Sequence, residues 1–357
     1  MIHQRRILVT GGAGFIGSAL CRHLIRQGHF VVNVDKLTYA GHLASLKEID
    51  AAPNYVFVRG DICDERLMRA TLAQHEIDTI MHLAAESHVD RSIDGPAAFV
   101  ETNVVGTHTL LKAAREVWLG GQAPVPHRFH HVSTDEVYGS LAPGAPGFYE
   151  DQKYEPNSPY SASKAASDHL VRAYHHTYGL QVTTSNCSNN YGPFHFPEKL
   201  IPLCITNILR GLPLPVYGDG SNIRDWLYVE DHCRGIELVL ERGVVGETYN
   251  IGGNNEWSNL AIVELLCDRV DARFAADPKL AARFPAAPAA SGNSARELVG
   301  FVEDRAGHDW RYAIDAGKLS AALGYAPRET FESGLELTLD WFLANEEWWR
   351  PLLVGQA

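Results

Sequence analysis

The chain has no apolar run long enough to cross a membrane, and its N-terminus has no hydrophobic leader segment. We therefore expect a cytoplasmic protein with no membrane partner. Positive charge is also scarce: the chain has 31 Lys and Arg residues but 43 Asp and Glu residues, so its formal net charge is -12 at pH 7. A nucleic-acid-binding protein normally has a basic surface, so we expect no nucleic-acid partner. A local group of basic residues could still bind an anionic small molecule.

Cysteine is sparse as well, with six residues among 357 and no C-x-x-C motif. This pattern is typical of reduced thiols rather than of a disulfide framework. Seventeen histidines are present, and the closest groups are His127, His130 and His131, and the pair His175 and His176. Neither group has the spacing of a known metal site with cysteine or carboxylate partners, so we favour structural histidines and expect no metal. The length predicts about two domains.

Short apolar segments that end in ligand-compatible loops recur along the first half of the chain. We expect strands at residues 6–10, 30–35, 55–58, 79–83 and 128–132, and helices over 19–25 and 99–117. This alternation predicts parallel β-α-β units. In such sheets the carboxyl ends of the strands meet at the ligand site.

The first of these loops carries the pattern G-x-x-G-x-x-G at Gly11, Gly14 and Gly17. Between a strand and a helix, such glycines permit a tight turn and let a pyrophosphate approach the helix N-terminus; a plain glycine-rich turn is the alternative. Asp35 ends the second strand, where a carboxylate can bond the adenosine ribose and repel a 2′-phosphate. This favours NAD over NADP, although Lys36 follows directly.

Two later loops add to the predicted cofactor site. Asp61 and Ile62 follow the third strand and could hold the edge and face of the adenine. Ala84 and Ala85 follow the fourth, and their small side chains would let a ligand lie against the backbone.

Tyr160 and Lys164 have the i, i+4 spacing that places two side chains on one face of a helix. The pattern is common and weak alone, but gains weight after an NAD-type first half. Lys164 can bond the nicotinamide ribose and, with the charge of the oxidised ring, favour the tyrosinate. Lowering the pKa of a tyrosine from about 10 to about 7 requires roughly 4 kcal/mol.

The adjacent carboxylates Asp135 and Glu136 follow the predicted strand at 128–132. One interpretation is a solvated turn or helix cap. However, a carboxylate pair at the end of a buried strand is costly unless the protein uses it.

Several of these segments resemble a known family. T-G-G-A-G-F-I-G at residues 10–17, together with Tyr160 and Lys164, is similar to the extended short-chain dehydrogenase/reductase superfamily, also called the NAD-dependent epimerase/dehydratases. S-T-D-E-V-Y-G at 133–139 resembles the dTDP-glucose 4,6-dehydratase family. The similarity continues through residues 35–41, 83–92, 188–193, 197–202, 215–218, 222–226 and 304–309. Asp135 carries the distinction, because related GDP-sugar dehydratases and decarboxylases share only Glu136 in kind.

The resemblance implies an α/β fold: a Rossmann-like doubly wound parallel sheet with a smaller, discontinuous C-terminal substrate domain. We expect residues 1–190 to form the NAD-binding domain, with return segments around 223–252. Residues 191–222 and 253–357 would form the nucleotide-sugar domain. The family also implies a homodimer, with the helices from Phe99 and Tyr160 as candidate contacts.

The implied reaction is removal of water from dTDP-glucose by a lyase that regenerates its NAD in every turnover. Tyr160, supported by Lys164, would take the proton of the C4 hydroxyl during oxidation, and Thr134 would bond the C4 oxygen. Glu136 would remove the C5 proton. Asp135, protonated, would give a proton to the departing C6 hydroxyl. Adjacent carboxylates discourage double ionisation, so one of them can hold a proton near neutrality.

The resemblance also implies two sets of binding residues. The cofactor set is Gly11, Gly14, Phe15, Ile16, Gly17, Asp35, Lys36, Leu37, Thr38, Asp61, Ile62, Leu83, Ala84, Ala85, Ser87, Thr102, Tyr160, Lys164 and Asn190. The substrate set is Ser87, Thr134, Asn189, Lys199, Leu200, Pro215, Val216, Tyr217, Arg224, Asn259, Arg305 and His308. Lys199, Arg224 and Arg305 are the physical candidates for the diphosphate.

Three alternatives remain open at this point. The substrate could be another nucleotide sugar, such as a UDP or CDP hexose, because the carboxylate pair does not contact the base. The enzyme could be an epimerase or decarboxylase, which Asp135 argues against. The chain could also be a catalytically silent NAD-binding regulator, but such a protein need not keep Asp135, Glu136, Tyr160 and Lys164 together.

Overall fold

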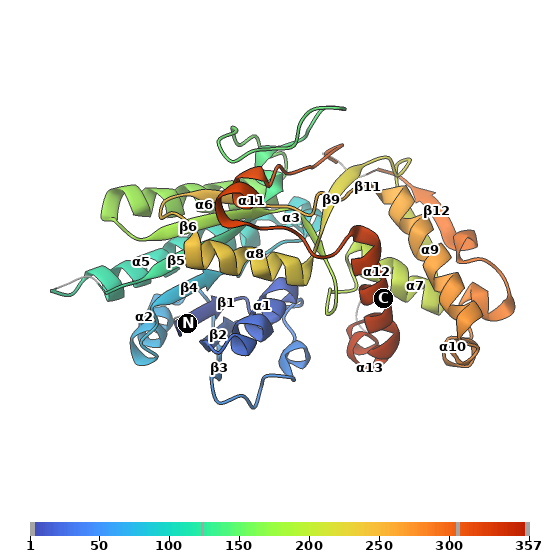
Figure 1. Ribbon diagram of the computed structural model, residues 1–357, viewed down its shortest axis with the longest axis horizontal. Helices are drawn as coiled ribbons and strands as arrows, with labels where there is room; N and C mark the ends of the chain where they lie inside the picture. Colours follow the sequence, from blue (N-terminus) through green and yellow to red (C-terminus); the bar gives the residue numbers. More distant parts are fainter. Residues whose placement is uncertain (1–3, 123–124, 305–307, 354–357) are drawn as a thin grey trace.

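A sheet of seven parallel strands, in the order β10-β6-β5-β4-β1-β2-β3, is the largest element of the computed structural model, which describes residues 4–122, 125–304 and 308–353 (Figure 1). Its strands are β1 (Arg6–Thr10), β2 (Phe30–Asp35), β3 (Tyr55–Arg59), β4 (Thr79–His82), β5 (Arg128–Thr134), β6 (Val182–Cys187) and β10 (Thr248–Ile251). The strand order changes direction between β1 and β4, which is where doubly wound proteins bind ligands. The predicted Rossmann-like fold is therefore confirmed.

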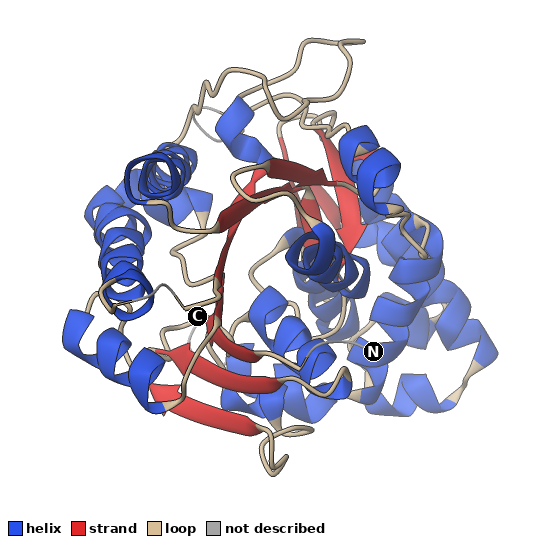
Figure 2. Ribbon diagram, turned by 60° about the vertical axis from the view of Figure 1, so that its left-hand side comes forward, coloured by secondary structure: helices blue, strands red, loops and turns tan. Residues whose placement is uncertain are grey.

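Helices cover both faces of this sheet because its central strands are buried on both sides (Figure 2). One face carries α1 (Phe15–Arg26), α8 (Val229–Arg242) and α11 (Gly317–Leu323). The other carries α2 (Glu65–Gln74), α5 (Thr107–Leu119) and α6 (Pro159–Tyr178). On α5 the apolar residues Leu110, Leu111, Ala113 and Ala114 are buried.

The helix predicted over 99–117 is helical throughout but changes its winding. It consists of α4 (Pro96–Phe99), the π-helical segment η2 (Val100–Gly106) and α5. The wider π turn is often found at functional sites because it re-aims side chains. In η2 it directs Thr102 to the main cavity and buries Asn103.

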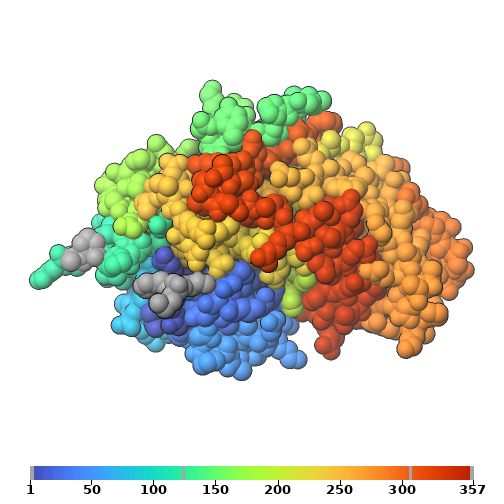
Figure 3. All heavy atoms as spheres, viewed as in Figure 1, coloured from blue at the N-terminus to red at the C-terminus, as the bar shows by residue number. Residues whose placement is uncertain are grey.

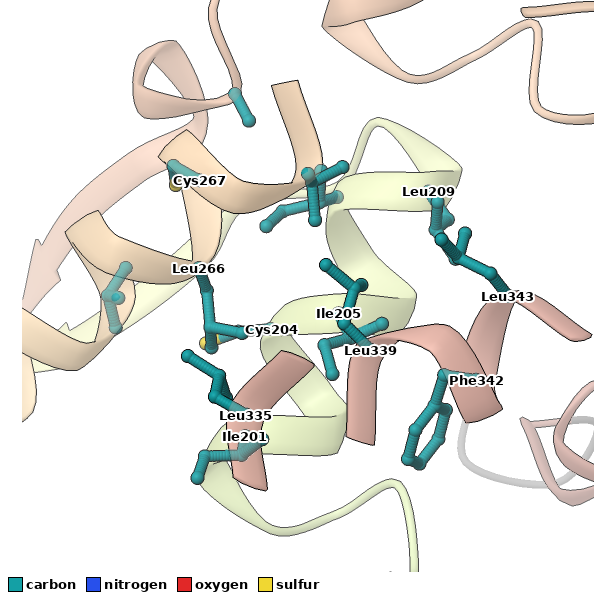
Figure 4. Packing of buried hydrophobic residues seen from close by; sticks show 14 of the residues in the cluster. Ile201, Cys204, Ile205, Leu209, Leu266, Cys267, Leu335, Leu339, Phe342 and Leu343 are labelled. Carbon is teal, nitrogen blue, oxygen red and sulfur yellow. The ribbon is translucent and has the colours of Figure 1, made fainter. Parts of the chain in front are cut away.

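A second core lies beside the sheet and is built by helices from the C-terminal half. In the space-filling view, the orange surface of this half forms the end of the molecule away from the blue N-terminal residues (Figure 3). The long helices of this core are α7 (Leu200–Arg210), α9 (Asn259–Ala276) and α12 (Phe331–Ala344). Figure 4 shows side chains of the three helices packed together, including Ile205, Leu266 and Leu339. Two small sheets border this core: β11 (Glu256–Ser258), β9 (Ile223–Tyr228) and β7 (Asn189–Tyr191), and β12 (Val299–Val302) with β8 (Leu214–Tyr217).

The chain passes between the two cores more than once. After β9, which pairs with β7 and β11 in the small sheet, α8 packs against α1 and β10 pairs with β6. Within 223–252, the return to the large sheet therefore starts at α8. The domain boundaries themselves stay a prediction.

Short elements complete the described chain. They are η1 (Leu43–Leu46), α3 (Val89–Asp94), η3 (Asp135–Tyr138), α10 (Lys279–Arg283), η4 (Pro288–Ser291), η5 (Ala295–Leu298), α13 (Glu346–Trp349) and η6 (Pro351–Leu353). Among the helices of the described residues, none combines the length and the apolar character needed to span a membrane.

Candidate active site

A cavity of about 520 Å³ lies between the carboxyl ends of the large sheet and the C-terminal core. Most of the residues predicted for cofactor, substrate and catalysis line it together. They are Gly11, Gly14, Phe15, Ile16, Gly17, Asp35, Lys36, Thr38, Asp61, Ile62, Leu83, Ala84, Ala85, Ser87, Thr102, Thr134, Asp135, Glu136, Tyr160, Lys164, Asn189, Asn190, Lys199, Leu200, Pro215, Tyr217, Arg224, Asn259 and His308. Segments far apart in the sequence thus converge on one site.

Two predicted residues that the structure describes do not line the cavity. Leu37 has a left-handed backbone (φ 58°), and its side chain packs against the core beneath α1. Val216 is buried in the C-terminal core because side chains alternate along β8, whereas its neighbours Pro215 and Tyr217 line the cavity. Arg305 lies outside the described residues.

The glycine loop brings the backbone of β1 against that of the fourth βα loop. Gly11 has φ 72°, and a Cβ there would lie 2.7 Å from the Cα of Ala84. A Cβ at Gly17 would lie 2.1 Å from the carbonyl oxygen of Gly11. Gly14 forms the N-cap of α1 without a side-chain capping bond. The loop therefore leaves the positive N-terminal end of α1 open to an anionic ligand.

Gly17→Ala should destabilise the protein, because the close contact with Gly11 would force α1 away from the loop. We expect a loss of about 1–3 kcal/mol in the free energy of unfolding. Chemical denaturation measures this loss. Gly300→Ala is the matched control, since its Cβ would meet no atom within 4 Å. Equal stability of the two variants would contradict the close-packed loop.

Asp35 holds the glycine loop in addition to facing the cavity. Its Oδ2 accepts a hydrogen bond from the amide of Ala13 at 2.9 Å, and its Oδ1 accepts one from the amide of Leu37 at 2.8 Å. Nearby, Lys36 Nζ lies 2.8 Å from Asp61 Oδ2. The positive charge that follows Asp35 is therefore paired with the carboxylate of the third βα loop.

The fourth βα loop is fixed from two sides. Thr10 Oγ1 accepts hydrogen bonds from the amides of Leu83 and Ala84, both at 3.2 Å. Asn103 accepts from the amide of Glu86 at 2.8 Å and donates to its carbonyl at 3.0 Å. The π-helical segment η2 thus sets the shape of this wall of the cavity.

The carboxylate pair occupies the short helix η3, directly after β5. Thr134 caps it, and its Oγ1 accepts a hydrogen bond from the amide of Glu136 at 3.3 Å. Asp135 is 1% exposed. Burial, followed by the nearby charges of Glu136 and Asp225, raises the pKa of Asp135 well above its usual range and so favours the protonated form of this carboxyl.

The two carboxyl oxygens of Asp135 differ in their contacts. Oδ2 is buried and makes no hydrogen bond to the described residues, whereas Oδ1 lies 3.3 Å from Thr134 Oγ1. Buried polar atoms are nearly always paired in folded proteins. Because Asp135 lines the cavity, this oxygen is suited to contact a ligand there.

Tyr160 and Lys164 lie on the first turns of α6, which begins with a capping box at Ser158. Burial and the charge of Glu136 raise the pKa of Tyr160, and these effects outweigh any contribution from Lys164. Lys164 Nζ donates to the carbonyl of Val132 at 2.8 Å. In the protein without ligand the tyrosine pKa is thus raised, and its lowering in the presence of NAD stays a prediction.

The part of the cavity formed by the C-terminal half presents two basic residues in different surroundings. Lys199, at the N-cap of α7, donates from Nζ to the carbonyl of Ser87 at 3.4 Å. Arg224 is 5% exposed and donates to the carbonyls of Ile223 and Asp309 at 2.7 and 2.9 Å. Its guanidinium also lies 4.2 Å from the ring centre of Tyr312.

Some cavity residues were not predicted from the sequence. His195 stacks on Phe15 with ring centres 4.2 Å apart, so the C-terminal half contacts the start of α1. Glu198 lies 3.3 Å from Nη2 of Arg91. Tyr312 also lines the cavity. His195 and Glu198 lie between or within matched segments, but only the fold reveals their partners.

The clustered histidines have protein partners. His130 contacts Thr183 and Ser185, both at 3.0 Å, and His131 contacts Asp168 at 2.9 Å. Within residues 4–122, 125–304 and 308–353, no group of three His, Cys, Asp or Glu side chains is arranged to hold a metal ion.

Comparison with known proteins agrees with this arrangement. The sequence model of a family described as GDP-mannose 4,6 dehydratase matches residues 8–338. The dTDP-glucose 4,6-dehydratase of Neisseria meningitidis serogroup B is 55% identical over 355 residues, which cover 99% of this chain and 97% of that protein. The enzyme of the same name from Salmonella typhimurium is 55% identical over 354 residues, covering 96% and 94%.

A solved structure matches the fold over nearly the whole chain. The dTDP-glucose 4,6-dehydratase DesIV of Streptomyces venezuelae, determined with NAD bound, has a TM-score of 0.86 and 48% identity. The match covers 97% of this chain and 99% of DesIV. The protein therefore belongs to the dTDP-glucose 4,6-dehydratase family of the extended short-chain dehydrogenase/reductases.

Proposed function

We propose that the protein converts dTDP-glucose into dTDP-4-keto-6-deoxyglucose and water, with tightly bound NAD. The observation that carries this proposal is the carboxylate pair at the end of β5. Asp135 is buried with a raised pKa, which favours its protonated form, and it lines the same cavity as Glu136. Elimination of water requires an acid for the leaving hydroxyl and a base for the neighbouring C–H proton, and this pair supplies both.

The residues of the sheet edge fit NAD. The loop Gly11–Gly17 and the N-terminus of α1 would hold its pyrophosphate, and Asp35 would bond its adenosine ribose. The Ala84 and Ala85 side chains leave room against the backbone. When bound, NAD supplies a hydride acceptor for C4 and a hydride donor for C6.

Tyr160 acts on the C4 hydroxyl in this proposal. Its phenolate removes the hydroxyl proton, and Thr134 donates a hydrogen bond to the same oxygen. Lys164 holds a positive charge one helical turn behind Tyr160, which favours the phenolate once the cofactor charge is also present. The raised pKa of Tyr160 in the protein alone keeps the residue neutral until the site is assembled.

Glu136 and Asp135 act on C5 and C6. Oxidation at C4 makes the C5 proton acidic, and Glu136 removes it and returns a proton to C5 when C6 is reduced. Asp135 gives its proton to the departing C6 hydroxyl. The division of roles follows from burial, because the more buried Asp135 holds its proton more firmly.

The nucleotide would lie against the C-terminal core. Lys199 and Arg224 would bind the diphosphate, and the half-exposed Tyr217 would stack on the base. The remaining candidates for this subsite are Ser87, Asn189, Leu200, Pro215, Asn259 and His308.

Lys199→Met should weaken substrate binding more than it slows the chemistry. We expect KM for dTDP-glucose to rise roughly 10- to 100-fold, the range for a lost hydrogen bond to a charged group. Steady-state kinetics measures the change. Lys279→Met removes an exposed lysine of α10, away from the cavity, and should leave KM as it was. An unchanged KM in Lys199→Met would exclude Lys199 from the diphosphate site.

The proposal also includes two domains in each chain and a homodimer of two chains. Residues 1–190 with the return around 223–252 would bind NAD, and 191–222 with 253–357 would bind the nucleotide sugar. Two copies would pack through α5, α6 and the adjoining η2, where Val100 and Val105 are exposed. The dimer would act in the cytoplasm. Light scattering that gives the mass of a single chain would contradict the homodimer.

A panel of nucleotide sugars tests the proposed reaction. With dTDP-glucose we expect a product lighter by one water. Loss of water only from a UDP or CDP hexose would show that the protein is a dehydratase with a different substrate. A product of unchanged mass with an inverted hydroxyl would identify an epimerase, and loss of carbon dioxide would identify a decarboxylase.

A further inference from the structure

Two buried charged residues, one turn apart on α6, hold the strand that leads to the carboxylate pair. Lys164 Nζ donates to the carbonyl of Val132 at 2.8 Å. Asp168 Oδ2 accepts a hydrogen bond from Ser133 Oγ at 2.9 Å, and its Oδ1 lies 2.9 Å from Nε2 of His131. Three consecutive residues of β5 are thus fixed to α6 directly before the catalytic positions.

The groups that contact Asp168 do not neutralise it. Ser133 is a neutral donor, and Tyr154, whose hydroxyl also interacts with Asp168, is neutral because burial raises its pKa. Burial lowers the pKa of His131 well below its usual range, so this ring is neutral and donates from Nε2. His169, at the next position of α6, acts on Asp168 only through its charge, which lowers the pKa of that carboxyl.

Lys164 faces few charged groups. Burial lowers its pKa, while the charge of Asp168 raises it. The other titratable groups around it are Cys187 of β6, His82 of β4 and His131 of β5. Burial keeps the thiol of Cys187 protonated, with a pKa of about 12, and keeps both imidazoles neutral. Among these groups, Asp168 is therefore the one whose negative charge can stabilise the Lys164 ammonium.

We propose that Asp168 is a positioning residue for the Tyr160–Lys164 pair: its buried carboxylate fixes α6 to Ser133 and His131 of the strand that leads to Asp135 and Glu136, and its negative charge favours the charged form of Lys164, which holds the carbonyl of Val132 between them. The inference rests on the proposed function, in which the Lys164 charge favours the Tyr160 phenolate. Asp168 itself lies behind the cavity wall and touches no reacting atom. Its effect on catalysis passes through the charge state of Lys164.

Asp168→Asn separates the charge from the hydrogen bonds. The amide oxygen can still accept from Ser133, and the amide nitrogen can donate to His131 once that ring moves its proton to Nδ1, which has no partner among the described residues. We expect the alkaline limb of the pH profile for reduction of bound NAD to move down by about 1 to 3 pH units, because an opposite charge shifts a pKa by this amount.

Two variants control for a merely structural role. Ser133→Ala removes a hydrogen bond to Asp168 but keeps the charge, so its alkaline limb should stay at the wild-type pH. Asp168→Glu also keeps the charge and should keep the wild-type limb even if the protein is less stable. An Asp168→Asn limb at the wild-type pH would overturn the proposal. If Asp168→Asn does not fold, a shifted limb in Asp168→Glu would overturn it.

Unfolding gives a readout that needs no catalysis. Burial raises the pKa of Asp168 to about 6, opposed by Lys164. Its protonated form therefore stabilises the folded state below pH about 4, and this contribution is lost as pH rises through about 6. The stability of wild type relative to Asp168→Asn should fall over this interval in denaturant titrations. If the free energies of unfolding of the two proteins changed in parallel with pH, a buried charge at Asp168 would be contradicted. Failure to dehydrate any nucleotide sugar would contradict the proposed function instead.

Discussion

Glu136→Gln should stop the loss of water while leaving oxidation at C4 intact. Glutamine has the size of glutamate but cannot accept the C5 proton, and loss of a general base typically costs 10²- to 10⁴-fold in rate. Tyr160, Thr134 and Lys164 are unchanged in this variant. We therefore expect the absorbance of reduced nicotinamide to appear on substrate addition and to persist, because the 4-keto intermediate cannot proceed.

Exchange at C5 tests this assignment directly. In deuterated water the wild type should exchange solvent deuterium into C5, and Glu136→Gln should not. Glu150→Gln is a matched control, because Glu150 is partly buried outside the cavity and accepts a bond from the amide of Asn250 at 2.8 Å that glutamine can reproduce. Exchange at the wild-type rate in Glu136→Gln would show that another group is the base.

Tyr160→Phe should abolish the reaction one step earlier. Without the phenol, no group at this position can take the proton of the C4 hydroxyl, so bound NAD should stay oxidised when substrate is added. We expect a loss of at least about 10²-fold in the rate of nicotinamide reduction. Stopped-flow absorbance in a single turnover measures this rate apart from later steps.

Tyr138→Phe controls for the loss of a buried hydroxyl. Tyr138 Oη donates to Asn250 at 3.0 Å and accepts from Asn186 at 2.8 Å, outside the cavity. Its removal should reduce stability but leave nicotinamide reduction in place. Reduction of bound NAD at the wild-type rate in Tyr160→Phe would assign the proton transfer to another residue.

The parts of the site with the clearest physical rationale in the sequence lie close together along the chain, whereas the scattered substrate residues were predicted from the family resemblance. The glycine loop, the pair Asp135 and Glu136, and Tyr160 with Lys164 each form a short pattern with a physical purpose. Each follows or begins a regular element, so the fold class also fixes its place at the sheet edge. The structure brings these patterns into one cavity.

Other features depend on contacts that no local pattern records. Asp168 is an ordinary helix residue in sequence, and only the packing of α6 on β5 places it beside His131 and Ser133. Tyr312 and Arg224 are 88 positions apart in the sequence. The guanidinium of Arg224 lies over the ring of Tyr312 because the neighbouring residues Ile223 and Arg311 pair in an isolated β-bridge. Long-range pairs of this kind need the tertiary structure.

Irregular spacing of apolar residues also limits what can be predicted from the sequence. The segment 274–295 is rich in alanine and proline and has no clear periodicity. It nevertheless holds the end of α9, the short helix α10 and η4, with Phe274 and Phe284 buried in the C-terminal core. A few large apolar side chains at uneven spacing are enough to fix a segment against a core that already exists.

The central claim is a dehydratase that returns to C6 the hydride it takes from C4. The most direct measurement uses dTDP-glucose with deuterium at C4 and determines the mass and label position of the product. We predict a product that has lost one water and carries the deuterium at C6, with no reduced nicotinamide released into solution. Loss of the label to solvent, or a labelled product that keeps its water, would contradict the account.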